Sequence, residues 1–122
     1  MYTGEKGMEK NDMLELARET RKKIRKVFTD KVETITAYDI DDKLDHSTFK
    51  LNFAAYNYVW VEFDYENDWC EFFIVLNEAC KQSLYSKTKF SEITDWDAYL
   101  TEIMKEIELR IPEKYLKAKG WL

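Results

Sequence analysis

The chain has 122 residues, of which 45% are hydrophobic and 16% aromatic, which is enough for one domain around a core of ordinary size. Its apolar runs fall short of the roughly 18 residues of a membrane-spanning helix, and its N-terminus lacks the hydrophobic segment of a secretory signal, so we expect no membrane contact and a cytoplasmic location. The net charge of −5 is uneven, because residues 1–31 carry a balance of +3 and leave −8 for residues 32–122.

The first expected element is a helix that follows a polar segment. Residues 1–11 are polar and contain two glycines, so we expect them to be disordered and a single domain to span residues 12–122. Asp12, followed three residues later by Glu15, is a variant of the capping box and predicts a helix from there to about Phe28. Hydrophobic residues recur along it at helical spacing: Met13, Ala17, Ile24, Val27 and Phe28.

The same helix carries a basic cluster of six residues: Arg18, Arg21, Lys22, Lys23, Arg25 and Lys26. A phosphate backbone could dock on such a cluster, which makes a nucleic-acid-binding module one alternative function. Three observations argue against it. Helical spacing makes the cluster an ordinary solvent face, the acidic remainder of the chain would repel nucleic acid, and no aromatic residue lies among the basic ones to stack on a base.

Strands are expected next. The segments Lys31–Ile40 and Thr48–Ala54 are strand candidates, and the acidic stretch Asp39–His46 is expected to form a polar loop between them. A three-residue loop at residues 55–57 would then lead into the following strand. In the second candidate strand, alternation predicts three residues on the core face: Phe49, Leu51 and Phe53.

The most regular pattern lies between Tyr56 and Leu76, where two alternating runs meet at Asn67-Asp68. Asn and Asp tolerate positive φ, so these two residues predict a two-residue hairpin loop. One set of opposite pairs is apolar and is expected to face the core: Tyr65 with Cys70, Phe63 with Phe72, Val61 with Ile74, and Val59 with Leu76. The other set is mixed: Glu66 with Trp69, Asp64 with Glu71, Glu62 with Phe73, and Trp60 with Val75.

The mixed face is the candidate binding surface. Asp64 opposite Glu71 is a like-charge pair that destabilises a sheet, so something must offset it. The loop at residues 55–57 would place Lys50 opposite Glu62, which offers neutralisation from within the chain; a basic partner is the other possibility. Aromatic residues anchor interfaces and carboxylates steer basic partners. The candidate protein-binding residues are Tyr58, Trp60, Glu62, Asp64, Glu66, Asp68, Trp69, Glu71 and Phe73.

The C-terminal part contains a second helix. Residues 77–90 fit neither a helical nor a strand period and are left unassigned. Thr94 followed by Asp97 matches the capping box and predicts a helix from Asp95 to about Arg110. Its apolar stripe is continuous and would cover the sheet: Trp96, Tyr99, Leu100, Ile103, Met104, Ile107 and Ile111.

The chain is expected to end in a short helix. Pro112 stops the preceding helix or opens this one, and Gly120 is placed to close it in the left-handed conformation with Trp121 folding back. The complete prediction is an α+β fold: an N-terminal helix, an antiparallel β-meander of 3–5 strands, a C-terminal helix packed on one sheet face and a short terminal helix.

An enzymatic alternative rests on the Asp39–His46 segment. His46 beside Asp45 has the composition of a hydrolase acid–base pair, but no serine or cysteine nucleophile stands in a recognisable context. The aspartates could also ligate a hard cation, although Lys43 and Leu44 occupy the fifth and sixth positions where an EF-hand requires an oxygen ligand and a glycine. A small hydrolase or a metal-dependent enzyme therefore remains an alternative.

Other cofactor signatures are missing from the sequence. Cys70 and Cys80 lie ten residues apart and read as small buried hydrophobes in a reducing compartment, and one histidine with two separated cysteines has no zinc-ligand spacing. We therefore expect no cofactor and no metal, and a binding protein is favoured over an enzyme.

The main functional hypothesis is a protein-binding domain. An acidic domain of this size with an aromatic and acidic sheet face resembles, in charge, size and architecture, the small bacterial immunity proteins that inhibit a basic nuclease toxin. The resemblance implies a basic, toxin-like partner. The same face could instead hold two copies of the chain together as a homodimer.

Overall fold

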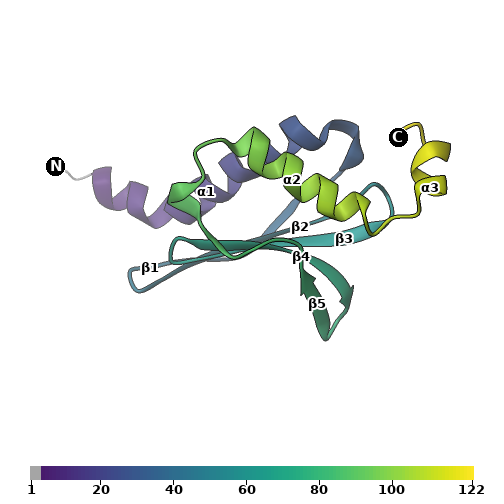
Figure 1. The fold of residues 1–122 in the computed structure, drawn as a ribbon. Coiled ribbons are helices and arrows are strands. Elements are labelled where there is room, and N and C mark those ends of the chain that lie inside the picture. Colours follow the sequence, from purple (N-terminus) through teal and green to yellow (C-terminus); the bar gives the residue numbers. More distant parts are fainter. Residues whose placement is uncertain (1–3) are drawn as a thin grey trace.

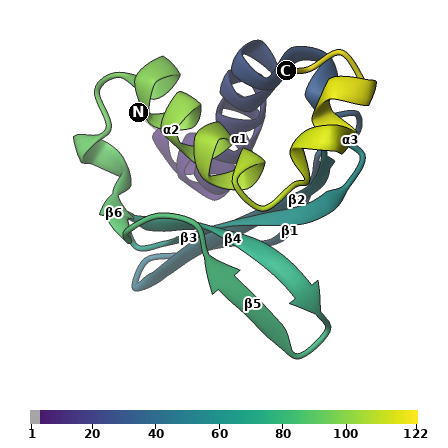
Figure 2. The same ribbon diagram turned by 45° about the vertical axis from the view of Figure 1, so that its right-hand side comes forward.

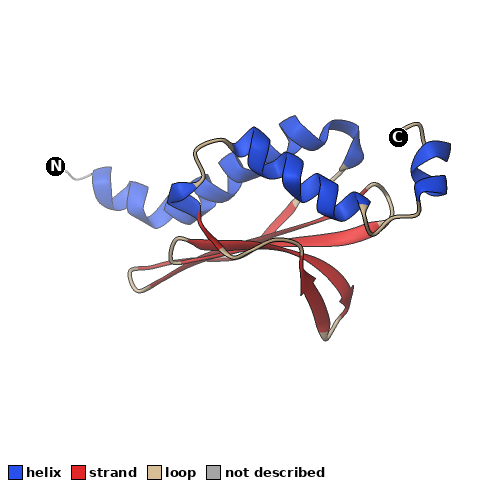
Figure 3. Ribbon diagram, viewed as in Figure 1, coloured by secondary structure: helices blue, strands red, loops and turns tan. Residues whose placement is uncertain are grey.

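The computed structural model describes the backbone of residues 4–122 and the side chains from residue 12 onward. Its helices and strands are α1 Gly4–Phe28, β1 Thr36–Lys43, β2 His46–Ala55, β3 Val59–Glu66, β4 Trp69–Asn77, β5 Cys80–Ser83, β6 Thr88–Lys89, α2 Trp96–Glu108 and α3 Glu113–Ala118, with 3-10 turns at Thr29–Lys31 and Phe90–Glu92. The predicted α+β fold and its order of elements are confirmed. Helices α1 and α2 lie across one side of an antiparallel sheet (Figure 1), and Figure 3 shows the same two layers coloured by type of structure.

The sheet is a meander. Strands β1 to β5 lie side by side in chain order, each antiparallel to its neighbour, and the short strand β6 pairs with the beginning of β4. The five strands of the meander agree with the predicted three to five, and β6 is an addition. Strand β5 bends away from the helices, so that it projects from the opposite side of the sheet (Figure 2).

The register of the β3–β4 hairpin follows the prediction. Asn67 and Asp68 have φ of 47° and 72°, the left-handed values that a two-residue hairpin loop requires at both positions. The observed pairs run from Glu66 with Trp69 to Trp60 with Val75, and the last predicted pair, Val59 with Leu76, falls beyond them. In the observed pairs the side chains predicted to face the core do so. Leu76 was wrongly assigned to the core face: it is 59% exposed, because the bulge between Val75 and Asn77 interrupts the alternation there.

The β2–β3 turn lies one residue later than predicted. Tyr56 and Asn57 take positive φ values of 58° and 55°, and Lys50 lies opposite Asp64 instead of Glu62. The predicted loop at residues 55–57 and the predicted Lys50 pairing are therefore wrong. Moving the turn by one residue shifts the cross-strand partner of each β2 residue by two positions along β3. Because side chains alternate with a period of two, the same residues still face the core.

Contacts from distant segments place this turn. Tyr56 is fully buried; its N–H donates to the Lys31 carbonyl at 2.7 Å, and its hydroxyl donates to the Glu108 carboxylate at 2.6 Å. The Tyr115 hydroxyl of α3 donates to the Tyr56 carbonyl at 2.9 Å. An aromatic residue in the left-handed region is strained, and these three contacts together with burial hold it there.

The core lies between the sheet and the helices. The predicted stripes of both long helices are buried or half-buried, and Phe49, Leu51 and Phe53 of β2 are fully buried, as predicted. The other fully buried residues include Ile24, Phe28, Val61, Phe63, Phe72, Leu100, Ile103 and Ile107. Since the helices cover only one face, side chains of the opposite parity on β2 to β4 point away from them.

The N-terminal helix differs from the prediction at its start. Helix α1 begins at Gly4, so Asp12 lies inside it and does not cap it. The carboxylate of Asp42 on β1 instead accepts a hydrogen bond from the Met13 N–H at 2.8 Å, which ties the helix to the sheet edge. The predicted disorder of residues 1–11 stays a prediction, because residues 1–3 and the side chains of residues 4–11 lie outside the described part.

Two strand boundaries need correction. The expected strand Lys31–Ile40 is β1, which begins at Thr36, and β2 begins at His46 instead of Thr48. The stretch Asp39–His46 is therefore the β1–β2 hairpin with a turn at Leu44-Asp45, and it is not an open loop. Asp39 interrupts the pairing of β1 with a φ of 51°.

The C-terminal helices follow the prediction closely. The cap of α2 is Asp95, whose carboxylate accepts from the Ala98 N–H at 3.0 Å, whereas the sequence suggested Thr94. Pro112 precedes α3, as expected, and Gly120 ends it with a φ of 77°. The Trp121 N–H bonds back to the Leu116 carbonyl at 3.0 Å, which closes the helix in the expected way.

Candidate functional site

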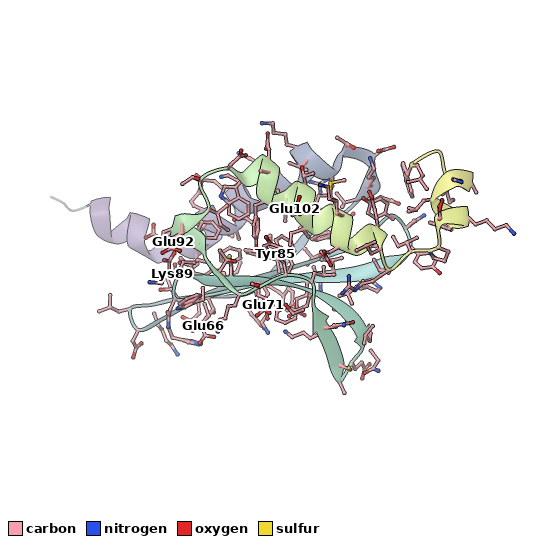
Figure 4. The ribbon with its side chains drawn as sticks, in the orientation of Figure 1. Glu66, Glu71, Tyr85, Lys89, Glu92 and Glu102 are labelled. Atoms are coloured by element: carbon pink, nitrogen blue, oxygen red, sulfur yellow. The ribbon has the colours of Figure 1, made fainter. Side chains whose placement is uncertain are left out.

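The candidate site is the side of the sheet that α1 and α2 leave uncovered, which we call the open face. Seven of the nine predicted binding residues lie on it by strand register: Trp60, Glu62, Asp64, Glu66, Trp69, Glu71 and Phe73. Trp60 and Trp69 remain 57% and 41% exposed. Figure 4 shows Glu66 on the side of the sheet opposite Glu102 of α2.

The other two predicted residues lie elsewhere. Tyr58, in the β2–β3 turn, packs its ring against that of Tyr115 in α3, with 4.7 Å between centroids. The Asp68 carboxylate is engaged within the chain, because it accepts hydrogen bonds from the backbone N–H and the hydroxyl of Ser91 at 3.0 and 2.6 Å. Both residues therefore have local structural contacts away from the open face.

A lysine that the sequence did not single out organises the centre of the open face. The Lys81 ammonium, from β5, lies 2.6 Å from the Glu62 carboxylate and 2.8 Å from that of Asp64. Its cation also lies 4.2 Å from the centre of the Phe73 ring. Lys50, the expected source of neutralisation, is 3.9 Å from Asp39 instead. The like-charge cost at Asp64 is thus offset from within the chain, by Lys81.

Lys81 reaches these carboxylates because of the shape of the sheet. It pairs with Val75 near the end of β4, where a bulge between Val75 and Asn77 bends the β4–β5 hairpin. The hairpin projects from the open face (Figure 2), so a side chain on β5 can cross β4 to reach β3. All four residues of β5 are exposed, and the usual alternation of a strand is therefore missing from this segment.

Glu62 is the best satisfied carboxylate of the site. Besides Lys81, it accepts a hydrogen bond from the Tyr38 hydroxyl of β1 at 3.2 Å. Burial and this neighbouring carboxylate raise the pKa of Tyr38 to about 12, so the phenol stays protonated and continues to donate. Burial alone would raise the pKa of Glu62, but hydrogen bonds with Asp64 and Lys81 outweigh it and lower the pKa to about 2.

Asp64 behaves oppositely. Burial, followed by its hydrogen bond with Glu62, raises the pKa of the Asp64 carboxyl from 3.8 to about 6. One of its oxygens, Oδ1, is buried without a hydrogen-bond partner within the described residues. An ionised Asp64 is therefore held at a cost, and it takes up a proton more readily than an aspartate in the unfolded chain.

The raised pKa of Asp64 predicts a specific pH dependence of the free energy of unfolding. Folded Asp64 binds a proton between about pH 4 and pH 6 while the unfolded chain does not, so the free energy of unfolding should fall as pH rises through that window. We expect this fall in the free energy of unfolding to be about 1.5 kcal/mol, a value reduced to allow for the partial exposure of Asp64, and to be absent from the Asp64→Asn variant. Urea unfolding of the wild type and of Asp64→Asn, from pH 4 to pH 7, measures this difference.

An NMR titration supplies an independent check of the same prediction. The carboxyl carbon of Asp64 should titrate with a midpoint near the value of about 6. A midpoint at the ordinary value, or a stability curve that keeps its fall in Asp64→Asn, would contradict the raised pKa.

The open face is hollowed in two places next to each other. One depression of about 440 Å³ is lined by Asp64, Glu66, Asn67, Trp69, Cys70, Glu71, Phe73 and Lys87. The second, of about 510 Å³, is lined by Asp39, Ile40, Asp41, His46, Thr48, Lys50, Asp64, Tyr65 and Glu66. Carboxylates outnumber lysines in the lining of each, and Asp64 and Glu66 form the wall that they share. The face therefore offers two adjoining sites of negative charge.

The histidine lies in the second depression between two carboxylates. His46 Nε2 is 3.2 Å from Glu66, and Nδ1 is 3.9 Å from Asp41, so the adjacent Asp45 is not its partner. The neighbouring hydroxyl, that of Ser47, donates to the Lys43 carbonyl. Within the described residues no three His, Cys, Asp or Glu side chains are placed to hold a metal ion. The geometry is that of a cluster of polar side chains at a hairpin.

Neither the cysteines nor the basic residues of α1 form a further candidate site. Cys70 is buried, as expected, and burial raises the pKa of its thiol to about 12, so it is a poor nucleophile. Cys80 is exposed, so the expectation that it is buried was wrong, and the two cysteines are not bonded to each other. Four of the six basic residues of α1 already have contacts within the chain: Arg18 with Glu15, Lys23 with the Trp96 ring, Arg25 with the Glu33 carbonyl and Lys26 with Asp97. Two of these contacts, those of Arg18 and Lys26, are with carboxylates and partly offset the positive charge that α1 could offer to a phosphate backbone.

Comparisons with known proteins do not point to a function: no protein-family model, no curated protein and no solved structure matches the chain. In the part of the chain that the structure describes, no helix combines the length and the apolar character needed to cross a membrane. The open face is therefore the feature of the molecule from which we infer a function.

Proposed function

We propose that the protein is a binding domain whose open face docks on a basic protein. The observation that supports this most directly is the exposure of two tryptophan rings, Trp60 and Trp69, on the face that the helices leave uncovered. A tryptophan carries a large apolar surface that gains free energy when it is removed from water, and it loses little conformational entropy on binding. Two such rings on one face are typical anchors of an interface.

Charge supports a basic partner. The carboxylates of Glu62 and Asp64 share one cation, Lys81, which leaves them a net negative charge when both are ionised. Glu71 has no ion-pair or hydrogen-bond partner within the described side chains, and Glu66 is 63% exposed beside His46. Exposed carboxylates around aromatic anchors raise the rate of encounter with a positive surface and reject negative ones. The partner that fits is a protein with a basic patch.

The specific form of the proposal is a cytoplasmic bacterial inhibitor of the immunity type. Such a protein acts by covering the basic, substrate-binding surface of a toxin-like enzyme, and it needs no catalytic group of its own. The present chain suits that role, because it is acidic, with a net charge of −5, and forms a single small α+β domain. This form rests on analogy of size, charge and architecture.

Affinity capture with matched variants tests the proposal. The wild-type chain and the double variant Trp60→Ala/Trp69→Ala serve as baits for a lysate of the source organism, at low and at high salt. We expect the wild type to retain a basic protein that high salt releases, and the double variant to bind it at least about 30-fold more weakly, since two hot spots are lost.

Leu109→Ser is the matched control. Leu109 is 77% exposed and lies at the end of α2, in the helical layer, so its replacement should leave capture unchanged. Light scattering on the purified chain covers the competing possibility. A dimer that Trp60→Ala/Trp69→Ala converts to a monomer would mean that the open face joins two copies of the chain, and the proposal would be wrong.

A further inference from the structure

Trp69 lies on the open face beside two acidic side chains, and Lys89 is its neighbour on the other flanking strand, β6. Glu66 is directly opposite it on β3, and Glu71 is two residues along β4 on the same side of the sheet. Directly opposite residues have Cβ atoms about 5 Å apart, and residues at i and i+2 of a strand about 7 Å apart. The Trp69 ring is therefore flanked by two carboxylates, and all three residues line the same depression of about 440 Å³.

The aromatic rings of this depression already attract cations. The ammonium groups of Lys89 and Lys87 lie 5.5 and 5.8 Å from the centre of the Trp69 ring, and Lys81 lies 4.2 Å from the centre of the Phe73 ring. None of the three is held by the carboxylates that flank Trp69: Lys81 pairs with Glu62 and Asp64, and Lys87 and Lys89 have no ion pair within the described side chains. The intramolecular cations show which kind of charge the ring faces accept. Glu71 has no partner within the described side chains, and Glu66, which is 63% exposed, has His46 Nε2 beside it at 3.2 Å.

We propose that the partner inserts an arginine side chain into this depression, where the guanidinium lies on the Trp69 ring between Glu66 and Glu71. This inference rests on the proposed function and adds the chemical group that is recognised. Arginine fits better than lysine because its planar guanidinium stacks on an aromatic ring while its N–H groups, which lie in the plane of the guanidinium, donate to carboxylates on either side. Lys87 and Lys89 lie on the ring that the guanidinium needs, so they compete with it.

A peptide titration of the full chain tests the inference without the natural partner. The probe is the blocked peptide Gly-Arg-Gly-Arg-Gly, with counterparts that carry lysine or citrulline in place of arginine, and the readout is the NMR shift of the tryptophan indole N–H signals. We expect the arginine peptide to shift the Trp69 signal in a saturable way. The lysine peptide should bind about threefold more weakly, and the citrulline peptide, which keeps the shape but lacks the charge, should not bind.

Three variants and one internal control make the result specific. Glu66→Gln and Glu71→Gln should each weaken binding of the arginine peptide by about threefold to tenfold, because each removes one charge-assisted hydrogen bond. The variant Lys87→Ala/Lys89→Ala should strengthen it, since competing cations are removed. Trp60, which pairs with Val75 at the other end of the hairpin, is the internal control and should not shift.

Several results would overturn the inference: an unmoved Trp69 signal, equal shifts of Trp60 and Trp69, equal binding of the arginine and lysine peptides, or no effect of Glu71→Gln. These failures can be distinguished from a failure of the proposed function. If Trp60→Ala/Trp69→Ala abolishes capture of a basic protein while the arginine peptide leaves Trp69 unmoved, the binding face is supported and the arginine site is wrong.

Discussion

Phe63→Ala is expected to lower the free energy of unfolding by about 4 kcal/mol, the usual cost of emptying a buried phenylalanine site. Phe63 is fully buried at the centre of β3. Its ring centroid lies 4.7 Å from that of Phe72 and 5.8 Å from that of Phe49, so its removal takes one ring from a row of three on adjacent strands. The loss combines transferred apolar surface with a cavity that the flanking strands cannot close.

Trp60→Ala is the matched control, three residues earlier on the same strand. Trp60 is 57% exposed on the open face, so the free energy of unfolding should change by less than about 1 kcal/mol although a larger side chain is removed. Urea denaturation of both variants gives the comparison. If Trp60→Ala proved as costly as Phe63→Ala, Trp60 would be a core residue, and the open face would lose its main anchor as a binding site.

Lys81→Met should destabilise the protein by about 2 kcal/mol at pH 8, a large effect for a residue on an edge strand. Removing one partner of a buried ion pair leaves an uncompensated charge and costs about 3–5 kcal/mol. Lys81 faces two carboxylates, but its side chain is 36% exposed, and water therefore screens part of the loss. Thermal and urea unfolding of the variant measure the effect.

The pH dependence of this variant identifies the cause. Without Lys81, the nearby Glu62 carboxylate and burial should raise the pKa of Asp64 further, so a proton replaces the missing cation as pH falls. The destabilisation should accordingly be smaller at pH 5 than at pH 8, and the double variant Lys81→Met/Asp64→Asn should recover part of the loss.

Lys87→Met is the control variant, because it makes the same change of side chain and loses the same positive charge without removing a contact with Glu62 or Asp64. Lys87 lies on the same face, but its contact is with the Trp69 ring at 5.8 Å, so its replacement should be nearly neutral at both pH values. An equal loss in Lys81→Met and Lys87→Met, or a loss independent of pH, would mean that the carboxylate contacts contribute little to stability.

Local patterns were sufficient where neighbouring residues decide the geometry. The β3–β4 register follows from Asn67-Asp68, since two residues that accept positive φ set the loop length, and loop length sets every pair of the hairpin. Alternation then separates Phe63 from Trp60 without reference to the rest of the chain. The helical stripe of α2 depends in the same way on a short repeat, and its prediction was correct.

Local patterns were insufficient where the position of a turn or strand depends on a residue far away in the chain. The β2–β3 turn lies one residue later than predicted because Tyr56 is held by the Lys31 carbonyl and by Glu108, which are 25 and 52 positions away in the chain. Segment 77–90 could not be assigned because β5 is short and exposed on all four residues, so no periodicity marks it as a strand. Lys81, which lies in that segment, was therefore missed as part of the site.

Sequence patterns suffice to predict the α+β fold, the order of the elements, which parity of β3 and β4 is buried, and the seven residues that share the open face. These properties depend on periodicity and turn chemistry, which act over a few residues. Tertiary contacts establish which cation pairs with Glu62 and Asp64, that Tyr58 and Asp68 are engaged away from this face, and where the open face is hollowed. Such properties arise from contacts between segments far apart in the chain, whose positions follow from the bend of the sheet and the packing of the core rather than from any local pattern.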